Sequence, residues 1–363
     1  MSSFFGQYLR LSLFGQSHGE AIGLTMDGFP AGLLIDEARL DRELARRAPG
    51  QSLLTTSRRE DDRPQVLSGV LNGRTTGQPL CVTIRNTNTH SADYGEGVDL
   101  VRPGHADYTG HVRYFGYEDW RGGGHFSGRL TAPLVYAGTL CAQWLEEKGV
   151  RIFSHIQSLG GLRDDGFLSL GGQLPPDTLK GQTLPVLRSG LAEQMERVIL
   201  EAREKQDSVG GVIECMAAGL PAGLGAPFFD SAESVLSHLM FSVPAVKGVS
   251  FGEGFGFAEL PGSEANDPFR MSEGRVVTET NHAGGVLGGI TNGMPLIFRC
   301  AVRATPSIAR EQRTVSLRDG ENAVLSVRGR HDPCILPRAV PVIEAMCAIG
   351  LMEMWKEREA CLR

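Results

Sequence analysis

The chain repeats two of its own segments in order, and this internal repeat is the feature that most limits how it can fold. The hexapeptide GFPAGL at 28–33 returns as GLPAGL at 219–224. The longer segment GVLNGRTTGQPL at 69–80 returns as GVLGGITNGMPL at 285–296. One match of this kind can arise by chance, but two matches in the same order indicate a duplicated unit.

The duplication predicts two similar halves, about 1–150 and 205–363, related by a pseudo-twofold axis and each ending in a long helix. The glycine- and proline-punctuated segment at about 158–189 shows no site chemistry and is expected to be a connector. We expect residues 1–363 to form a single compact domain. A cleft where two such halves meet is a common position for a ligand.

Hydrophobic periodicity predicts the individual elements. Apolar alternation or short apolar runs predict strands at 8–14, 21–26, 66–71, 80–84, 212–217, 286–291 and 296–302. Helical spacing predicts helices after the N-cap residue Asp36 and at about 130–148, 191–205, 232–240 and 338–359. We interpret the apolar stripes of the two long helices as core or subunit contact, because methionine commonly fills irregular space in cores.

Composition excludes several classes of protein. The net charge of −6 argues against a nucleic-acid or membrane-surface partner. The cationic residues are 31 arginines and 5 lysines, a bias that suits multiply anionic substrates and that codon composition can also produce. Seven cysteines without a CxxC pair favour reduced thiols in the cytoplasm. We expect no signal peptide and no membrane span.

The segment RPGHADYTGHVRYFGYEDWRGGGHFSGR at 102–129 holds the densest group of residues suited to chemistry. The glycine run at 122–124 lets backbone N–H groups approach an anion closely. The arginines offer planar forks that match carboxylate and phosphate. His105 and His125 are side chains that can move protons near neutral pH. The segment therefore predicts an anion site with proton transfer.

Two further histidine motifs lie far away in the sequence, Ser17-His18 between two glycines and RGRHDPC at 328–334. A Ser/His/Asp hydrolase could be assembled from these residues, but no GxSxG elbow accompanies them. An HExxH motif, a P-loop and a strand-anchored GxGxxG are also missing. No metal site is therefore predicted.

Taken together and in order, the motifs resemble those of the chorismate synthase family. The matching segments are FGQSHG at 14–19, RRAPGQS at 46–52, TTSRRE at 55–60, RPGHADYT at 102–109, RGGGHFSGR at 121–129, PAVKGVSFGEGF at 244–255, NHAGGVLGGITNG at 281–293 and GRHDPC at 329–334. They span nearly the whole chain.

The resemblance implies a fold and an activity. The fold would be an α+β β-α-β sandwich of antiparallel sheets flanked by helices, and the assembly a homotetramer. The activity would be the 1,4-anti elimination of phosphate from 5-enolpyruvylshikimate 3-phosphate, a small anionic substrate, to give chorismate. The family requires FMN in its reduced form, FMNH2, although no net oxidation occurs. The sequence leaves open whether NADPH reduces the flavin on this chain or a separate reductase does so.

The resemblance also implies roles for individual residues. His18 matches the proton donor to phosphate, His105 the residue that protonates the reduced flavin, and Asp332 the carboxylate that works in removing the C6 proton. The substrate-binding matches are Ser17, Arg47, Arg58 and Arg129. The cofactor-binding matches are His125, Phe126, Ser127, Pro244, Ala245, Gly288, Arg303, Ala304, Thr305, Pro306, Ser307 and Arg330.

Several positions depart from the family pattern. Gln16 stands where an acidic residue is usual, and Leu53 where an arginine is usual. His125-Phe126-Ser127 replaces Arg-Ser-Ser or Arg-Ala-Ser, and Arg303-Ala304-Thr305 replaces Lys-Pro-Thr. Phosphate or nucleotide affinity is expected to change at these positions, with Arg58, Arg59 or His125 available to compensate.

Three alternatives stand beside this activity, and the departures at 53, 125–126 and 303–304 motivate the first of them. One is a family member with FMN and a different substrate. Another is a flavin- or anion-binding protein without catalysis, although a binding module needs no proton donors such as His18, His105 and Asp332. The most distant is a phosphatase or other hydrolase.

Overall fold

The computed structural model describes residues 3–50, 54–56, 62–87, 99–171, 173–327 and 331–362. The strands of the first half are β1 (Phe4–Phe5), β2 (Arg10–Gly15), β3 (Ala21–Asp27), β4 (Ala31–Leu34), β5 (Pro64–Ser68), β6 (Val70–Leu71), β7 (Arg74–Thr76) and β8 (Leu80–Arg85). Those that follow are β9 (Arg151–Leu159), β10 (Leu162–Arg163), β11 (Gly211–Ala218), β12 (Val246–Phe251), β13 (Phe269–Ser272), β14 (Arg275–Thr278), β15 (Val286–Leu287), β16 (Ile290–Thr291), β17 (Leu296–Val302), β18 (Gln312–Ser316) and β19 (Glu321–Leu325).

The helices are α1 (Glu37–Arg47), α2 (Asp107–Tyr114), α3 (Thr131–Glu146), α4 (Leu191–Glu204), α5 (Ala232–Ser242), α6 (Gly262–Ala265) and α7 (Leu336–Cys361). Both predicted long helices are therefore present, as α3 and α7. Asp36 caps α1 as predicted, because its side chain accepts a hydrogen bond from the Arg39 backbone N at 2.9 Å. No described helix combines the length and the apolar character needed to cross a bilayer.

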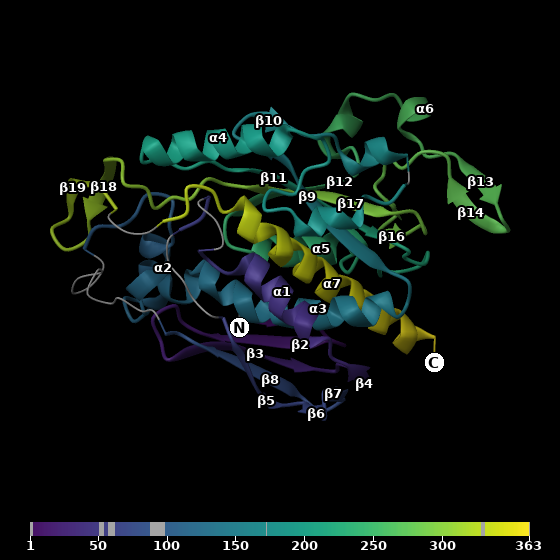
Figure 1. Ribbon diagram of the computed structural model, residues 1–363, viewed down its shortest axis with the longest axis horizontal. Helices are drawn as coiled ribbons and strands as arrows, with labels where there is room; N and C mark the ends of the chain where they lie inside the picture. Colours follow the sequence, from purple (N-terminus) through teal and green to yellow (C-terminus); the bar gives the residue numbers. More distant parts are fainter. Residues whose placement is uncertain are drawn as a thin grey trace.

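Two antiparallel sheets enclose a layer of helices (Figure 1). The first sheet has the strand order β1-β2-β3-β8-β5 and the second the order β10-β9-β11-β17-β12. Helix α3 packs on β3 and β8, helix α7 packs on β9 and β11, and the two helices pack against each other. This arrangement is the predicted α+β β-α-β sandwich, with one helix contributed by the end of each half.

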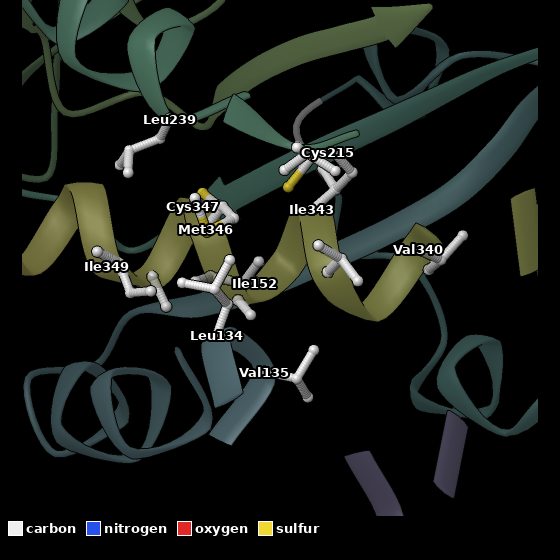
Figure 2. Close-up of a cluster of buried hydrophobic side chains, with 14 of the residues drawn as sticks. Leu134, Val135, Ile152, Cys215, Leu239, Val340, Ile343, Met346, Cys347 and Ile349 are labelled. Atoms are coloured by element: carbon white, nitrogen blue, oxygen red, sulfur yellow. The ribbon is translucent and has the colours of Figure 1, made fainter. Parts of the chain in front are cut away.

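The core lies between α7 and its neighbours (Figure 2). Helix α7 is buried around most of its circumference from Leu336 to Met354, because sheet, α3 and α5 cover it from different sides. One continuous cluster of buried apolar side chains includes residues of both halves, from Leu9 to Met354. Such a shared core joins the two halves into one packed body.

The sequence repeat returns as a repeated hydrogen-bond pattern. In the first half, the Thr75 hydroxyl accepts from Leu33 N at 3.1 Å and donates to the Pro30 carbonyl at 2.7 Å. The equivalent Thr291 accepts from Leu224 N at 2.9 Å and donates to the Pro221 carbonyl at 2.8 Å. The repeated residues therefore make the same turn in both halves. In each half the turn lies beside an equivalent antiparallel pair of strands, β3 with β8 in the first and β11 with β17 in the second.

Two predicted segments are more elaborate in the structure than the sequence analysis expected. The single strand predicted at 286–291 is a hairpin of β15 and β16, because Gly288 and Gly289 adopt positive φ and turn the chain between them. The connector at 158–189 is more than a link. It buries Phe167 and Leu179 against the sheet and supplies Asp164 to a buried ion cluster.

Candidate active site

A cleft of about 840 Å³ opens between the two halves. Its walls come from β1 and β2, the end of α1, the loop before α2, the segment 122–131 and the start of α7. The second half adds residues 238–247, from the last turns of α5 to the start of β12, and residues 303–307, after β17. The topology thus brings together segments that lie more than 300 residues apart in the sequence, which is the predicted position for a site.

Most of the predicted site residues line this cleft. They are His18, Arg47, His105, His125, Phe126, Ser127, Arg129, Pro244, Ala245, Arg303, Thr305, Pro306, Ser307 and Asp332. Ser17 and Ala304 adjoin lining residues but are not among them. Gly288 is not among the lining residues and lies in the turn between β15 and β16. Arg58 and Arg330 fall outside the described residues, as do Leu53 and Arg59.

The glycine run at 122–124 is required by the close approach of two histidines. All three glycines have positive φ, a backbone conformation that other residues rarely adopt. A Cβ at Gly122 would lie 1.9 Å from Nδ1 of His18, and a Cβ at Gly123 would lie 3.2 Å from Nε2 of His105. The run lets the backbone pass over both imidazoles, so it shapes the cleft whether or not it also binds an anion.

His105 belongs to a hydrogen-bonded group with Arg102 and Asp107. Its Nδ1 lies 2.7 Å from Asp107 Oδ1, and Arg102 donates to the same carboxylate through Nε at 2.7 Å and Nη2 at 2.6 Å. Burial opposes ionisation of Asp107, yet the hydrogen bonds from Arg102 and His105 hold its pKa well below the usual range. The imidazole is therefore held against an ionised carboxylate.

Arg47 and Arg129 share one buried carboxylate, that of Asp62. Arg47 Nη1 donates to Asp62 Oδ2 at 2.6 Å, and Arg129 Nη1 donates to Oδ1. The remaining guanidinium nitrogens donate to Thr131 and Gly128 from Arg47, and to Asn86 and Arg85 from Arg129. The two predicted substrate-binding arginines thus form a preorganised cationic wall of the cleft.

Asp332 accepts hydrogen bonds on both oxygens. The Thr56 backbone N donates to Oδ1 at 2.8 Å, and Arg338 Nη1 donates to Oδ2. Arg338 also donates from Nε to the Arg47 carbonyl at 3.0 Å, which links Asp332 to the arginine wall. Asp332 therefore faces the cleft as an oriented acceptor.

His125 and Phe126, which differ from the family pattern, both contact other residues of the chain. Nδ1 of His125 lies 2.9 Å from the Gly15 carbonyl and Nε2 lies 2.8 Å from the Ser3 hydroxyl. The Phe126 ring packs near Tyr114, with the ring centroids 6.1 Å apart. His125 thus ties the N-terminal segment to the cleft, and both of its ring nitrogens already have partners within the chain.

Arg303, where the family pattern has a lysine, contacts the first half of the chain. Arg303 Nη1 donates to the Gly104 carbonyl at 2.7 Å, one residue before His105. Beside it, Thr305 Oγ1 is buried and has no hydrogen-bond partner among the residues that the structure describes. The same holds for Nε2 of His331 within the described ranges. Burial and the cation of Arg102 lower the pKa of His331.

Several residues of this site had no role assigned to them in the sequence analysis. They are Asp62, Asp107, His331, Arg338 and Lys247. Asp107 and His331 stand within the motifs RPGHAD and GRHDPC, so their position next to predicted residues was an available signal. Asp62 and Arg338 have no such signal, since their partners are set by the fold.

Known proteins of one family resemble this chain along nearly its whole length. The family model described as chorismate synthase matches residues 9–355. The chain belongs to the chorismate synthase family. It is 45% identical over 355 residues to the chorismate synthase of Thermococcus kodakarensis, covering 98% of both chains. It is 43% identical over 361 residues to that of Dehalococcoides mccartyi, covering 98% of this chain and 96% of the relative.

A solved structure shares the fold. The crystal structure titled "Crystal Structure of Chorismate Synthase" superposes with a TM-score of 0.75 at 28% identity, covering 98% of this chain and 93% of that one. The predicted family and fold are therefore confirmed. As a member of the chorismate synthase family the chain is an enzyme, a lyase, and the cleft is its candidate active site.

Proposed function

We propose that the chain converts 5-enolpyruvylshikimate 3-phosphate to chorismate and phosphate in this cleft, with reduced FMN bound beside the substrate. One observation carries the proposal: His18, His105 and Asp332 line a single cleft together with the guanidinium groups of Arg47 and Arg129. Proton-transfer groups and anion-binding groups thus face the same space. A substrate with two carboxylates and a phosphate needs both.

The residues present fit a flavin mononucleotide. Leu11, Leu13, Val246 and Met346 give the cleft apolar surface against which a planar ring can pack. The buried hydroxyl of Thr305 has no hydrogen-bond partner within the described part of the chain, and a bound ligand would satisfy it. For the phosphate of FMN, the 303–307 segment offers Arg303, Thr305 and Ser307.

The substrate contacts would come from the opposite wall. Arg47 and Arg129, fixed by Asp62, would present positive charge to the anionic groups of the substrate, with Ser17 beside them. Preorganised charges of this kind stabilise developing negative charge without reorganising during the reaction. Arg58 is proposed as a further contact on the basis of its motif.

When bound, reduced FMN supplies electron density that helps the allylic C–O bond to phosphate break. His18 would donate a proton to the departing phosphate. Asp332, oriented by Thr56 N and Arg338, would accept the proton from C6. His105 would hold the flavin in its reactive protonation state. A positioned acid or base typically contributes 10²–10⁴-fold to a rate.

The test is an anaerobic assay of the purified chain with chemically reduced FMN, in which chorismate and phosphate are both measured. We expect one phosphate per chorismate and no turnover with oxidised FMN. Phosphate release without chorismate would instead support a phosphatase, and comparable turnover with oxidised FMN would refute the flavin's role. Replacing the chemical reductant with NADPH tests whether the chain reduces its own flavin.

The proposal extends to assembly and location, a homotetramer in the cytoplasm. All seven cysteines are free thiols, which fits a reducing compartment. Light scattering on the purified chain would give the mass of the assembly directly. A monomer or dimer at micromolar concentration would contradict the tetramer.

A further inference from the structure

We propose that Asp107 is a positioning residue that fixes both the tautomer and the direction of His105. The inference rests on the proposed function, because it concerns how one of the proposed proton-transfer residues is prepared. It assigns a task to a carboxylate that does not itself line the cleft.

The hydrogen-bond geometry sets the tautomer. His105 Nδ1 lies 2.7 Å from Asp107 Oδ1, and the Asp107 side chain is only 8% exposed. An ionised carboxylate accepts hydrogen bonds and cannot donate. Nδ1 must therefore carry a proton in this arrangement, which leaves Nε2 of neutral His105 as an acceptor.

In an alternative arrangement, Arg102 would donate to His105 Nδ1 and the imidazole proton would lie on Nε2. The distances argue against it. Arg102 Nη2 lies 3.1 Å from His105 Nδ1, so it could donate to an unprotonated Nδ1. In that case two acceptors, Nδ1 and Asp107 Oδ1, would face each other at 2.7 Å without a hydrogen between them. Arg102 already donates to Asp107 through Nε at 2.7 Å and Nη2 at 2.6 Å. Arg102 therefore holds the Asp107 carboxylate in place and balances its charge.

The direction of the ring follows from its other neighbours. Nε2 is the ring nitrogen beside Gly123, where a Cβ would lie 3.2 Å from it, and His105 lines the cleft. The backbone of the loop is held independently, because Arg303 donates to the Gly104 carbonyl at 2.7 Å. The loop is thus anchored from both halves, with Nδ1 used for anchoring and Nε2 left for the ligand.

Asp107→Asn tests the positioning of His105 without a large change in packing, since the amide has nearly the same shape as the carboxylate. Its NH2 group can donate to Nδ1 and so move the imidazole proton to Nε2. In a Ser-His-Asp triad the corresponding change to a wrong tautomer lowers kcat by about 10⁴-fold. A positioned acid or base contributes about 10²–10⁴-fold, and the ring is still present in the variant, so here we expect kcat to fall at least ~10-fold with the substrate KM within ~threefold.

The decisive measurement is the tautomer itself, read by solid-state NMR of protein labelled with ¹⁵N-histidine, with His105→Gln identifying the signal. The wild type should show a protonated Nδ1 and a bare Nε2 at high pH, and Asp107→Asn should show the reverse. A wild type with the proton on Nε2 overturns the proposal without any variant. That spectrum therefore decides the matter even if Asp107→Asn does not fold.

The chain offers a matched control in the pair His111, on α2, and Glu118, after the end of α2, whose Nδ1 and Oε1 lie 3.3 Å apart. Neither residue lines the cleft. Glu118→Gln should leave the His105 signal and chorismate formation within about twofold of wild type. An Asp107→Asn enzyme with normal kcat and an unchanged tautomer would refute the inference. A wild type that forms no chorismate would instead refute the proposed function.

Discussion

Arg47 and Asp62 form an ion pair that is almost removed from solvent: Nη1 lies 2.6 Å from Oδ2, and each side chain is 2% exposed. Arg129 binds the other oxygen of Asp62. Burial opposes ionisation of Asp62, but the two guanidinium groups outweigh it and lower its pKa. The carboxylate is therefore charged at neutral pH, and it allows two arginines to stand together beside a cleft.

The first prediction is that Asp62→Asn destabilises the fold. Two buried guanidinium groups would then face one neutral amide, and removing one partner of a buried pair costs about 3–5 kcal/mol. Denaturant unfolding should detect this loss, and the substrate KM should rise because the arginines are no longer fixed. Asp207→Asn, which removes a half-exposed partner of Arg310, should cost less than about 1 kcal/mol. Equal losses for the two variants would contradict the role of Asp62.

The second prediction concerns Gly122, which passes directly over His18. Gly122→Ala would place a methyl group 1.9 Å from His18 Nδ1 at a φ of +60°, so either the imidazole or the loop must move. We expect chorismate formation to fall at least ~10²-fold, the size of a lost acid–base contribution. Gly181→Ala is the control, because among the described residues, its two chain neighbours aside, no atom lies within 4 Å of its added Cβ. Retained activity in Gly122→Ala would show that the loop yields easily.

The third prediction tests Asp332 as the acceptor of the C6 proton. Asp332→Asn keeps the shape of the side chain and its hydrogen bond from Thr56 N, but it removes the base. Substrate and flavin binding should persist while anaerobic turnover falls about 10²–10⁴-fold. Calorimetric titration alongside the rate assay separates the two effects. Near-normal turnover would remove Asp332 from the catalytic residues and leave the family assignment intact.

Much of the fold could be predicted because periodicity and caps are local properties of a sequence. The predicted strand at 296–302 agrees with β17 residue for residue, and the predicted helices agree with α3, α4 and α7 to within a few residues. The hairpin of β15 and β16 was not predicted in the sequence analysis, because the two glycines interrupt an apolar run without changing its hydrophobic periodicity. Strand β9 was also missed, since it is buried along most of its length and does not alternate.

Residues of the candidate site could be predicted only where they belong to short sequence motifs. Histidines such as His18 and His105 stand out beside glycines, and the fold brings them into one cleft as expected. The long-range contacts of the arginines that line the cleft could not be predicted in the same way. Asp62 meets Arg129 across 67 positions of sequence, and Arg303 meets Gly104 across 199. The first pair forms only when the first half folds, and the second only when the two halves pack together.

The fourth prediction uses the repeat as its own control. Thr75→Val and Thr291→Val each remove a buried hydroxyl that serves one backbone N–H and one carbonyl. Leaving such groups unpaired costs about 1–3 kcal/mol, and the two losses should be similar because the surroundings repeat. Serine at either position should restore most of the stability. A large loss at one position and none at the other would show that the two turns are not equivalent.

A buried histidine gives the stability of the protein a defined pH dependence. His155 is fully buried, with Nδ1 3.2 Å from Asp164 Oδ2 and Nε2 2.9 Å from Glu214 Oε2. Both carboxylates also accept backbone N–H groups, of Leu187 and Arg188 for Asp164 and of Phe167 for Glu214. Two acceptors require protons on both ring nitrogens, so His155 is an imidazolium that joins the connector to the sheet.

The fifth prediction follows from the sign of this shift. Burial alone would lower the pKa of His155, but the hydrogen bonds to Asp164 and Glu214 outweigh it and raise the pKa. The stabilisation is therefore complete below the unfolded pKa of about 6.5 and is lost as pH rises toward the folded pKa, by about 1.4 kcal/mol per pH unit. Denaturant unfolding from pH 6 upward should show this decline in wild type and in His111→Gln, which changes an exposed histidine. The double variant His155→Gln/Glu214→Gln should show a smaller decline, and a slope equal to that of wild type would mean that His155 is not the group that titrates.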